Sequence, residues 1–331
     1  MCKKRNVIIA LGFMAVIILI QLLSLAKMVK NRIPIDQYVN AYVGKYQMIK
    51  LNTGLTKALT GGTYMESAEV LLGKNEWLFY KVTSDGEPLY DYMGINHFSD
   101  DELIKVRANM ESLGDMLENR GVKYAVLTVP NKEQVYSEYM PDTVAKIDNS
   151  SRLTDLSNYI RENCGNRING RAPYIDVTDV MLKAKDNYPV YYRTDTHWTE
   201  EGSFLALMQV MQELYGESES IEDVVFDEEP GFVGDLCKIS GTIDRFSDIN
   251  YRLNEDSINH TLKKDETLFI IGDSFGDAMI HTAKYYYKNV YWVRTKDYTG
   301  NLMDEYNPDV VIWECVERYL PDMRDYCISG M

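Results

Sequence analysis

The sequence predicts an α/β protein with a mainly parallel β-sheet flanked by helices. Apolar runs such as KYAVLTVP (123–130) and ETLFIIG (266–272) are typical of strands that are covered on both faces. Segments with helix start and stop signals lie between these runs, so strands and helices alternate along the chain. The 331 residues are 45% hydrophobic and 26% charged, which is typical of a globular chain with a substantial core.

The N-terminal segment differs from the rest of the chain. Twenty uncharged residues, Val7 to Ala26, follow a basic start, and a helix of this length can cross a bilayer. A cleaved signal peptide usually has a shorter apolar region, although Ser24 and Ala26 form a small-x-small cleavage pattern. We expect residues 1–32 to be a cytoplasmic tip and transmembrane anchor, and residues 33–68 to be a juxtamembrane helical segment. Basic residues flank the apolar run on both sides, so their balance does not fix its orientation.

Residues 69–331 are expected to form one domain, with an acidic, loop-rich insertion around 217–262 over its strand-end face. Ser99 and Glu102 form a capping box, which opens a helix that runs to Arg120. The other predicted elements are a hairpin over 69–82, strands over 123–130 and 172–177, helices over 151–163 and from Thr199 to about Tyr215, and strands over 266–274, 289–295 and 309–315.

The charge and the cysteines exclude some classes of partner and site. The chain has 35 Lys and Arg residues against 50 Asp and Glu residues, and its net charge is −15. Such an acidic surface repels phosphate backbones, so we expect no nucleic-acid partner. The five cysteines are scattered without metal-ligand spacing, and we expect mostly buried free thiols. We also expect neither a metal nor a cofactor.

The segment IIGDS (270–274) places a candidate nucleophile at the end of a predicted strand. In open α/β sheets, functional sites form at the carboxyl ends of the strands. Gly272 allows a tight turn, and Ser274 precedes a helix N-terminus, where free N–H groups can hold an oxyanion. Taken alone, however, Ser274 is more simply explained as a helix N-cap.

The segment TDTHWTEEG (194–202) supplies the candidate base. His197 can remove the proton of Ser274, and Asp195 can orient the imidazole and stabilise its charged form. Among the four histidines, only His197 has a carboxylate placed to orient it in this way. The alternatives are a cap network for the helix that begins near Thr199, or a metal site, for which the other histidines and carboxylates show no matching spacing. On one α/β frame, the two motifs together favour a Ser-His-Asp triad.

Five motifs, in matching order, resemble the AlgX/AlgJ family of SGNH-hydrolase-like O-acetyltransferases, which is also known by its Asp-His-His-Trp (DHHW) signature. They are GKNEWLFY (73–80), VPNKEQVYSEYMP (129–141), DTHWTEEG (195–202), GDSF (272–275) and VVIWECVERYL (310–320). The resemblance implies an SGNH-hydrolase-like, flavodoxin-like sheet. It also implies a periplasmic or extracellular protein, often membrane-anchored, that transfers acetyl groups onto hydroxyls of a polysaccharide. A membrane-bound O-acyltransferase partner usually supplies the acetyl donor.

The resemblance also assigns the catalytic residues. It places the family's Asp, His and Ser on Asp195, His197 and Ser274. Thr196 departs from the signature, which often has His there, but this residue lies between the pair and is not the base. Lys132 belongs to the family pattern without an evident role, and we expect it to be a solvated loop lysine.

The oxyanion and sugar contacts are less well defined. The usual SGNH oxyanion Gly and Asn have no clear counterparts, so Arg318 and Arg294 are candidates to polarise the ester. Ordinary surface or ion-paired arginines explain both positions at least as well. Trp77 and Trp198 are candidates to stack on a sugar, or else Trp77 belongs to the hairpin core and Trp198 packs beneath the histidine loop.

The function that we predict is a membrane-anchored, extracytoplasmic O-acetyltransferase that acts through an acetyl-enzyme on Ser274. Two alternatives remain, a carbohydrate O-acetylesterase with the same triad and a non-catalytic cell-surface scaffold that keeps the fold. The intact Asp195, His197 and Ser274 argue against the scaffold. The expected location is the cell membrane, with a single span and the catalytic domain outside the cytoplasm.

Overall fold

The computed structural model describes residues 67–331 and positions 14–15, 18–19, 21–22, 26 and 30. Most of the predicted anchor and of the juxtamembrane segment therefore lies outside the described residues. Within the described part of the chain, no helix is long and apolar enough to span a membrane. Residues 68–237 and 245–331 form one compact unit, which holds the central sheet and the helices around it.

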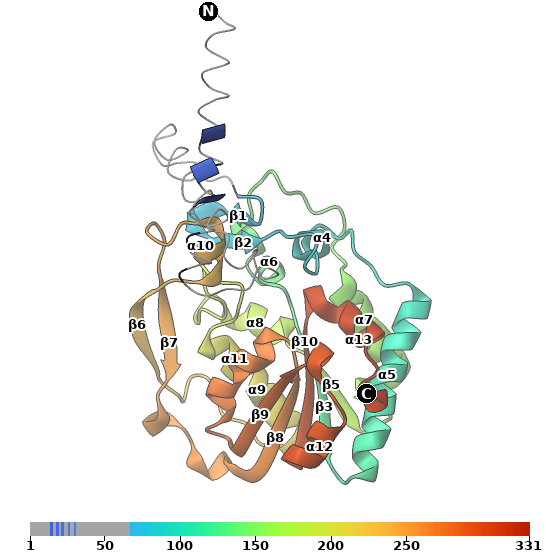
Figure 1. The fold of residues 1–331 in the computed structure, drawn as a ribbon. Helices are drawn as coiled ribbons and strands as arrows, with labels where there is room; N and C mark the ends of the chain where they lie inside the picture. The colour runs from blue at the N-terminus through green and yellow to red at the C-terminus, as the bar shows by residue number, and fades with distance from the viewer. Residues whose placement is uncertain (1–13, 16–17, 20, 23–25, 27–29, 31–66) are drawn as a thin grey trace, which may run out of the picture. The chain divides into compact units, whose positions relative to one another are not determined.

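A six-stranded sheet forms the centre of this unit (Figure 1). In spatial order its strands are β4 (Arg167–Ile168), β5 (Ala172–Asp176), β3 (Lys123–Val129), β10 (Val310–Val316), β8 (Lys264–Gly272) and β9 (Tyr287–Arg294). All neighbours pair in parallel except β4 and β5. The predicted α/β class and mainly parallel sheet are confirmed. The flavodoxin-like order is not, because the last strand, β10, lies between β3 and β8 and not at the end of the series.

Helices lie on both faces of the sheet. The α-helices of residues 67–331 are α4 (Pro88–Met93), α5 (Asp100–Asn119), α6 (Lys132–Val135), α7 (Arg152–Cys164), α8 (Thr178–Ala184), α9 (Glu200–Tyr215), α10 (Asp235–Ser240), α11 (Ser274–Ala283), α12 (Asn301–Tyr306) and α13 (Leu320–Asp325). Figure 1 shows α9 and α11 on one face of the sheet and α5, α7 and α13 on the other. The side chains of β3 alternate accordingly: Ala125 and Leu127 pack in the core with α9 and α11, whereas Tyr124 and Val126 pack in the core with α5 and α7.

Two hairpins lie outside the central sheet. The hairpin predicted over 69–82 is present as β1 (Val70–Leu72) and β2 (Leu78–Tyr80). The insertion, expected to be loop-rich, contains a second antiparallel pair, β6 (Phe226–Phe232) and β7 (Asp248–Leu253). Its first strand reads FDEEPGF and is mostly exposed, so it lacks the apolar alternation by which a strand is recognised.

Four cysteines lie among the described residues, and none of them forms a disulfide with another described residue. Cys237 and Cys315 are buried as expected, Cys164 is half-buried and Cys327 is exposed.

One glycine fixes how the segment before α9 approaches that helix. Thr199 caps α9, and its hydroxyl accepts the N–H of Gly202 at 3.2 Å. A Cβ on Gly202 would clash with the carbonyl oxygen of Val190. Glycine therefore lets the first turn of α9 lie directly against the segment that leads into the histidine loop, residues 192–197.

Candidate active site

The predicted serine and histidine meet at the carboxyl end of β8. Ser274 is the first residue of α11, and its Oγ lies 2.8 Å from Nε2 of His197. The other ring nitrogen, Nδ1, lies 2.7 Å from Oδ1 of Asp195. Both contacts expected from the sequence are present, although 77 residues separate Ser274 from His197.

The charges of this group favour proton uptake by the imidazole. Burial alone would raise the pKa of Asp195, but the hydrogen bond and charge of His197 outweigh it and lower the pKa to about 2. Burial would likewise lower the pKa of His197, but the hydrogen bond and charge of Asp195, with the charge of Asp235, raise it. The carboxylate therefore stays ionised at neutral pH and stabilises the imidazolium that would form when Ser274 loses its proton.

Asp235, from the insertion, completes the surroundings of the pair. Its backbone N–H donates to Oδ2 of Asp195 at 2.7 Å, and its carboxylate accepts the N–H and the hydroxyl of Thr196 at 2.8 and 2.6 Å. The departure from the family signature at Thr196 thus has a structural role, because this side chain ties the histidine loop to the insertion. Sequence reasoning missed Asp235, which is 40 residues from Asp195 in an acidic stretch without a motif.

The same three side chains are a possible cation site. Asp195, His197 and Asp235 offer ligand atoms that all lie within 4.8 Å of one another. A divalent cation bound there would take the place of the proton on Nδ1 of His197, since that nitrogen faces both carboxylates.

The first turn of α11 offers fewer free N–H groups than its place in the sequence predicts. The N–H of Phe275 donates to the side chain of Asp273 at 2.8 Å, and that of Gly276 donates to Oε2 of Glu314 at 2.9 Å. Within the described part of the chain, the backbone N–H of Ser274 has no acceptor in this turn. A single backbone donor is therefore available beside the serine oxygen.

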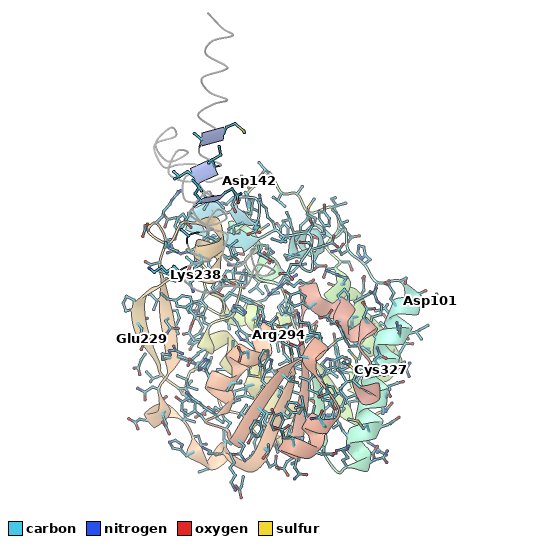
Figure 2. The ribbon with its side chains drawn as sticks, in the orientation of Figure 1. Asp101, Asp142, Glu229, Lys238, Arg294 and Cys327 are labelled. Carbon is cyan, nitrogen blue, oxygen red and sulfur yellow. The ribbon has the colours of Figure 1, made fainter. Side chains whose placement is uncertain are left out.

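The two candidate arginines lie in different settings. Arg318 is 6% exposed, its guanidinium carbon lies 5.2 Å from the centre of the Phe275 ring, and its Nε has no hydrogen-bond partner among the described residues. Arg294 ends β9 in register with Gly272 and is exposed (Figure 2). It makes no hydrogen bond or ion pair with another described residue. The structure thus brings Arg318, but not Arg294, against the helix that carries the serine.

The two candidate tryptophans are packed against aromatic neighbours. Trp198 is 2% exposed and meets the ring of Phe275 edge-on at 5.2 Å, beneath the histidine loop. Trp77 stacks on Tyr139 at 4.8 Å and also contacts Tyr136. These contacts fit the packing interpretation of both residues better than a role as open sugar platforms.

Two expectations about charged side chains were wrong. Lys132 is not a solvated loop lysine, because its side chain is 2% exposed beneath the histidine loop. Nor is His197 the one histidine with an orienting carboxylate, because Nδ1 of His97 lies 3.0 Å from Asp155, 58 residues away in the sequence. The second nitrogen of His97 faces the carbonyl oxygen of Gly94 at 3.2 Å, so this pair faces no hydroxyl nucleophile.

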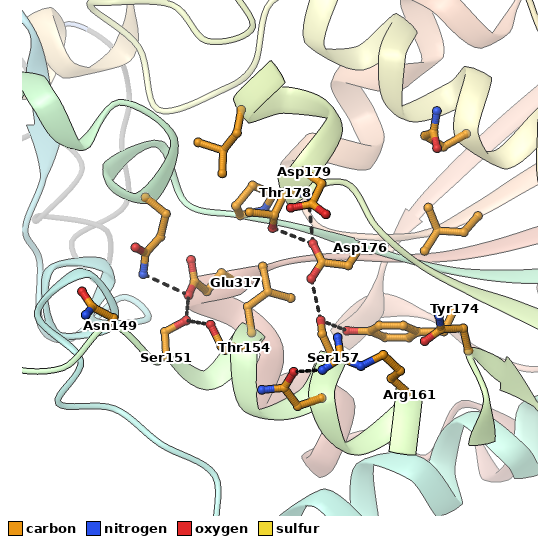
Figure 3. Close-up of a pocket in the computed structure, with 18 of the residues that line it drawn as sticks. Asn149, Ser151, Thr154, Ser157, Arg161, Tyr174, Asp176, Thr178, Asp179 and Glu317 are labelled. Atoms are coloured by element: carbon orange, nitrogen blue, oxygen red, sulfur yellow. Dashed lines mark hydrogen bonds between the residues drawn. The ribbon is translucent and has the colours of Figure 1, made fainter. Parts of the chain in front are cut away.

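A hollow of about 220 Å³ opens beside the histidine. Residues of the insertion form part of its wall, so the insertion reaches the site as expected. Its lining includes Asp195, His197, Tyr192, Phe232, Asn250 and Arg252. A larger hollow of about 720 Å³ lies where β3 and β5 end, with Ser157, Asp176 and Glu317 in its wall (Figure 3), but none of Ser274, His197 and Asp195 lines it.

The family model of the SGNH hydrolase-like domain of acetyltransferase AlgX matches residues 70–278. The chain belongs to this family. The match covers well over half of the chain and includes Asp195, His197 and Ser274. The predicted enzyme class, an SGNH-like O-acetyltransferase, is confirmed by this membership.

Two relatives match most of the length of the chain. A probable alginate O-acetylase AlgJ of Pseudomonas putida is 25% identical over 328 residues, covering 86% of this chain and 79% of the relative. The corresponding protein of Pseudomonas syringae pv. tomato is 25% identical over 326 residues, covering 86% of this chain and 78% of the relative.

Solved structures share the fold at lower identity. The O-acetyltransferase domain of Pseudomonas putida AlgJ superposes with a TM-score of 0.50 and 22% identity, over 76% of this chain and 92% of that domain. Bacillus cereus PatB1 superposes with a TM-score of 0.51 and 15% identity, over 78% of this chain and 99% of PatB1. A DHHW family protein from Eubacterium siraeum superposes with a TM-score of 0.50 and 15% identity, over 78% of this chain and 98% of that protein. At these identities the likeness supports the AlgX-family fold.

Proposed function

We propose that the protein is a membrane-anchored, extracytoplasmic O-acetyltransferase that moves acetyl groups onto hydroxyls of a polysaccharide. The observation that carries the proposal is the hydrogen-bonded chain from Asp195 through His197 to Ser274 in an AlgX-family domain. The relatives that are named as probable alginate O-acetylases support a polysaccharide acceptor. The apolar run from Val7 to Ala26 supports an anchor. The periplasmic or extracellular location that the family resemblance implies supports a site outside the cytoplasm.

In the first half-reaction Ser274 takes the acetyl group. As Oγ attacks the carbonyl carbon of the donor ester, its proton passes to Nε2 of His197, and Asp195 stabilises the resulting imidazolium. The negative charge on the carbonyl oxygen is held by the N–H of Ser274, and Arg318 is the nearby cation that can add to this stabilisation. Collapse of the intermediate breaks the donor C–O bond, and the leaving oxygen receives the proton from His197.

In the second half-reaction an acceptor hydroxyl takes the place of the leaving group. Nε2 of His197 removes the hydroxyl proton while the oxygen attacks the acetyl carbon on Ser274. The bond between Oγ and the acetyl carbon breaks, and Oγ regains a proton from the imidazolium. Water in the same position would give ester hydrolysis, so transfer requires an acceptor held beside His197.

The hollow beside His197 suits an acceptor sugar. Phe232 of the insertion stacks on Tyr192 at 4.4 Å, which gives the hollow an aromatic wall. Asn250 and Arg252 add polar groups that can bind hydroxyls. The acetyl donor would come from a membrane-bound O-acyltransferase partner beside the anchor.

Purified full-length protein with a chromogenic acetyl ester tests the chemistry. Without an acceptor we expect slow hydrolysis of the ester. When a polysaccharide acceptor is added, we expect faster ester consumption and acetylated glycan. Ser274→Ala should show neither hydrolysis nor transfer. Transfer by Ser274→Ala at the wild-type rate would exclude the mechanism. Phe232→Ala should raise the KM for the glycan but leave hydrolysis of the small ester unchanged.

The proposed location has a separate test. Protease added to intact cells should digest residues 34–331 and leave a cytoplasmic marker protein whole. Full protection of this domain in intact cells, with digestion after lysis, would place it inside.

A further inference from the structure

We infer that Lys132 is a positioning residue, whose ammonium group holds the histidine loop (residues 192–197) at three backbone carbonyls and so keeps His197 aimed at Ser274. The inference rests on the proposed triad and adds to it a residue that touches neither the substrate nor the reacting atoms.

The contacts of Lys132 converge on one loop. Its Nζ donates to the carbonyl oxygens of Tyr192, Arg193 and Asp195 at 3.2, 3.3 and 2.7 Å. The shortest of the three is to Asp195, the residue whose carboxylate orients His197. Lys132 itself begins α6, three residues after the last residue of β3, so it links the loop to the central sheet.

The loop needs such an anchor because it has little regular structure of its own. An isolated β-bridge pairs Tyr191 with Trp198, and residues 193–197 between these two form bends and join no strand. The hairpin and the insertion also hold the loop: the N–H of Leu78 donates to the carbonyl oxygen of Arg193 at 3.0 Å, and Asp235 accepts the N–H of Thr196 at 2.8 Å. Neither contact reaches the carbonyl oxygen of Asp195, whose donor among the described residues is Nζ of Lys132.

The burial of Lys132 has no explanation in an ion pair. No carboxylate of the described residues lies within ion-pair distance of Nζ, although a buried charge is costly without compensation. The rings of Trp77 and Phe79 lie 5.8 and 5.3 Å from Nζ and compensate for part of the lost hydration. Burial lowers the pKa of Lys132 to about 8. The three carbonyls match the three donors of an ammonium group, which the planar guanidinium of arginine would not reproduce.

The test compares Lys132→Met with Lys185→Met in the full-length protein. Lys185 is the control, because its side chain is only 14% exposed and it donates to a backbone carbonyl, that of Val135 at 2.7 Å, without touching the histidine loop. Unlike Lys132, it also forms an ion pair, with Glu138 at 2.8 Å. For each variant we would measure the melting temperature, kcat and KM for a chromogenic acetyl ester, and the rate at which phenylmethanesulfonyl fluoride labels Ser274. The downfield proton resonance of His197 Nδ1–H would report the contact with Asp195.

We expect Lys132→Met to lower kcat and the labelling rate about a hundredfold, the cost of a small misplacement of a catalytic group, with little change in KM. The Nδ1–H resonance should weaken or vanish. Lys185→Met should keep the wild-type kcat, labelling rate and Nδ1–H resonance, whatever it does to the melting temperature. If Lys132→Met does not fold, Lys132→Gln takes its place with the same expectations.

A folded Lys132 variant with wild-type kcat, labelling rate and resonance would overturn the inference while leaving the triad intact. If Ser274 of the wild-type protein is not labelled at all, the proposed triad fails and the inference fails with it.

Discussion

Replacing Asp195 with Asn tests how the site orients its histidine. Oδ1 of Asp195 accepts both Nδ1–H and the backbone N–H of His197, and Oδ2 accepts the N–H of Asp235. An amide has one acceptor oxygen, so either orientation leaves one of these buried backbone N–H groups facing an NH2 group. In one of the two orientations the NH2 group also donates to Nδ1, which puts the ring proton on Nε2, toward Ser274, where it blocks proton uptake.

These contacts set the size of the effect. One unpaired buried N–H should cost about 1–3 kcal/mol of folding free energy, whichever way the amide turns. The lost charge and the wrong tautomer should lower kcat about 10⁴-fold, the size of this effect in other serine triads. His197→Ala should cost more, about 10⁶-fold, because orientation can be partly kept but a missing base cannot be replaced.

The sign of the pH effect follows from the carboxylate. Asp195 raises the pKa of His197, so the wild-type acid limb, where the imidazole becomes charged and cannot act as a base, lies above the usual histidine range. Without the carboxylate that pKa falls, and the acid limb of Asp195→Asn should move to lower pH.

The assay is kcat for a chromogenic acetyl ester as a function of pH, with thermal unfolding measured in parallel. Asp176→Asn is the control, because Asp176 also accepts backbone and side-chain donors at the end of a strand, but away from His197. It should leave kcat and the acid limb unchanged. A wild-type kcat in Asp195→Asn, or an acid limb that does not move, would refute the assigned role of Asp195.

Three further predictions concern the supports of the site. Gly202→Ala should cost about 1–3 kcal/mol of stability and reduce activity, because the new methyl group meets the carbonyl of Val190. Gly114→Ala, on α5, should stabilise the protein by up to about 1 kcal/mol, because its methyl group would make only ordinary van der Waals contacts. Equal melting temperatures of the two variants would contradict this prediction. Burial, and the charge of Asp273, raise the pKa of Glu314, whose Oε2 accepts two N–H groups of the serine turn. A neutral amide can accept the same bonds, so Glu314→Gln should unfold at nearly the wild-type denaturant midpoint. Glu314→Leu cannot accept them and should lose about 1–3 kcal/mol of folding free energy per unpaired N–H. Dialysis against EDTA should leave ester hydrolysis unchanged, and a loss that zinc restores would instead indicate a working cation site.

The sequence was most informative where a local signal decides the structure. Continuous apolar runs predicted the parallel strands, and the capping box at Ser99 predicted the start of α5, because burial on both faces and helix capping are properties of short segments. Ser274 and His197 could be paired because each lay in a recognisable motif at an expected place in the fold.

The surroundings of the site depend on contacts between distant residues. Nothing near Lys132 in the sequence shows that three carbonyls some sixty residues later will surround its side chain. The position of β10 inside the sheet, and the contact of Asp235 with Asp195, likewise depend on tertiary packing. The appearance of Lys132 in a family motif was the available signal, and its charge led to the wrong expectation of exposure.

The most direct test of the account is to trap the acetyl-enzyme. Wild-type protein would be mixed with an acetyl ester in the absence of a glycan, quenched in acid after a short interval, digested and examined by peptide mass spectrometry. The proposed mechanism predicts one acetyl group on the peptide that contains Ser274, which disappears when a glycan acceptor is added before the quench and never forms in Ser274→Ala. Acetyl transfer by Ser274→Ala at the wild-type rate, or an acetyl group on a different residue that the glycan removes, would contradict it.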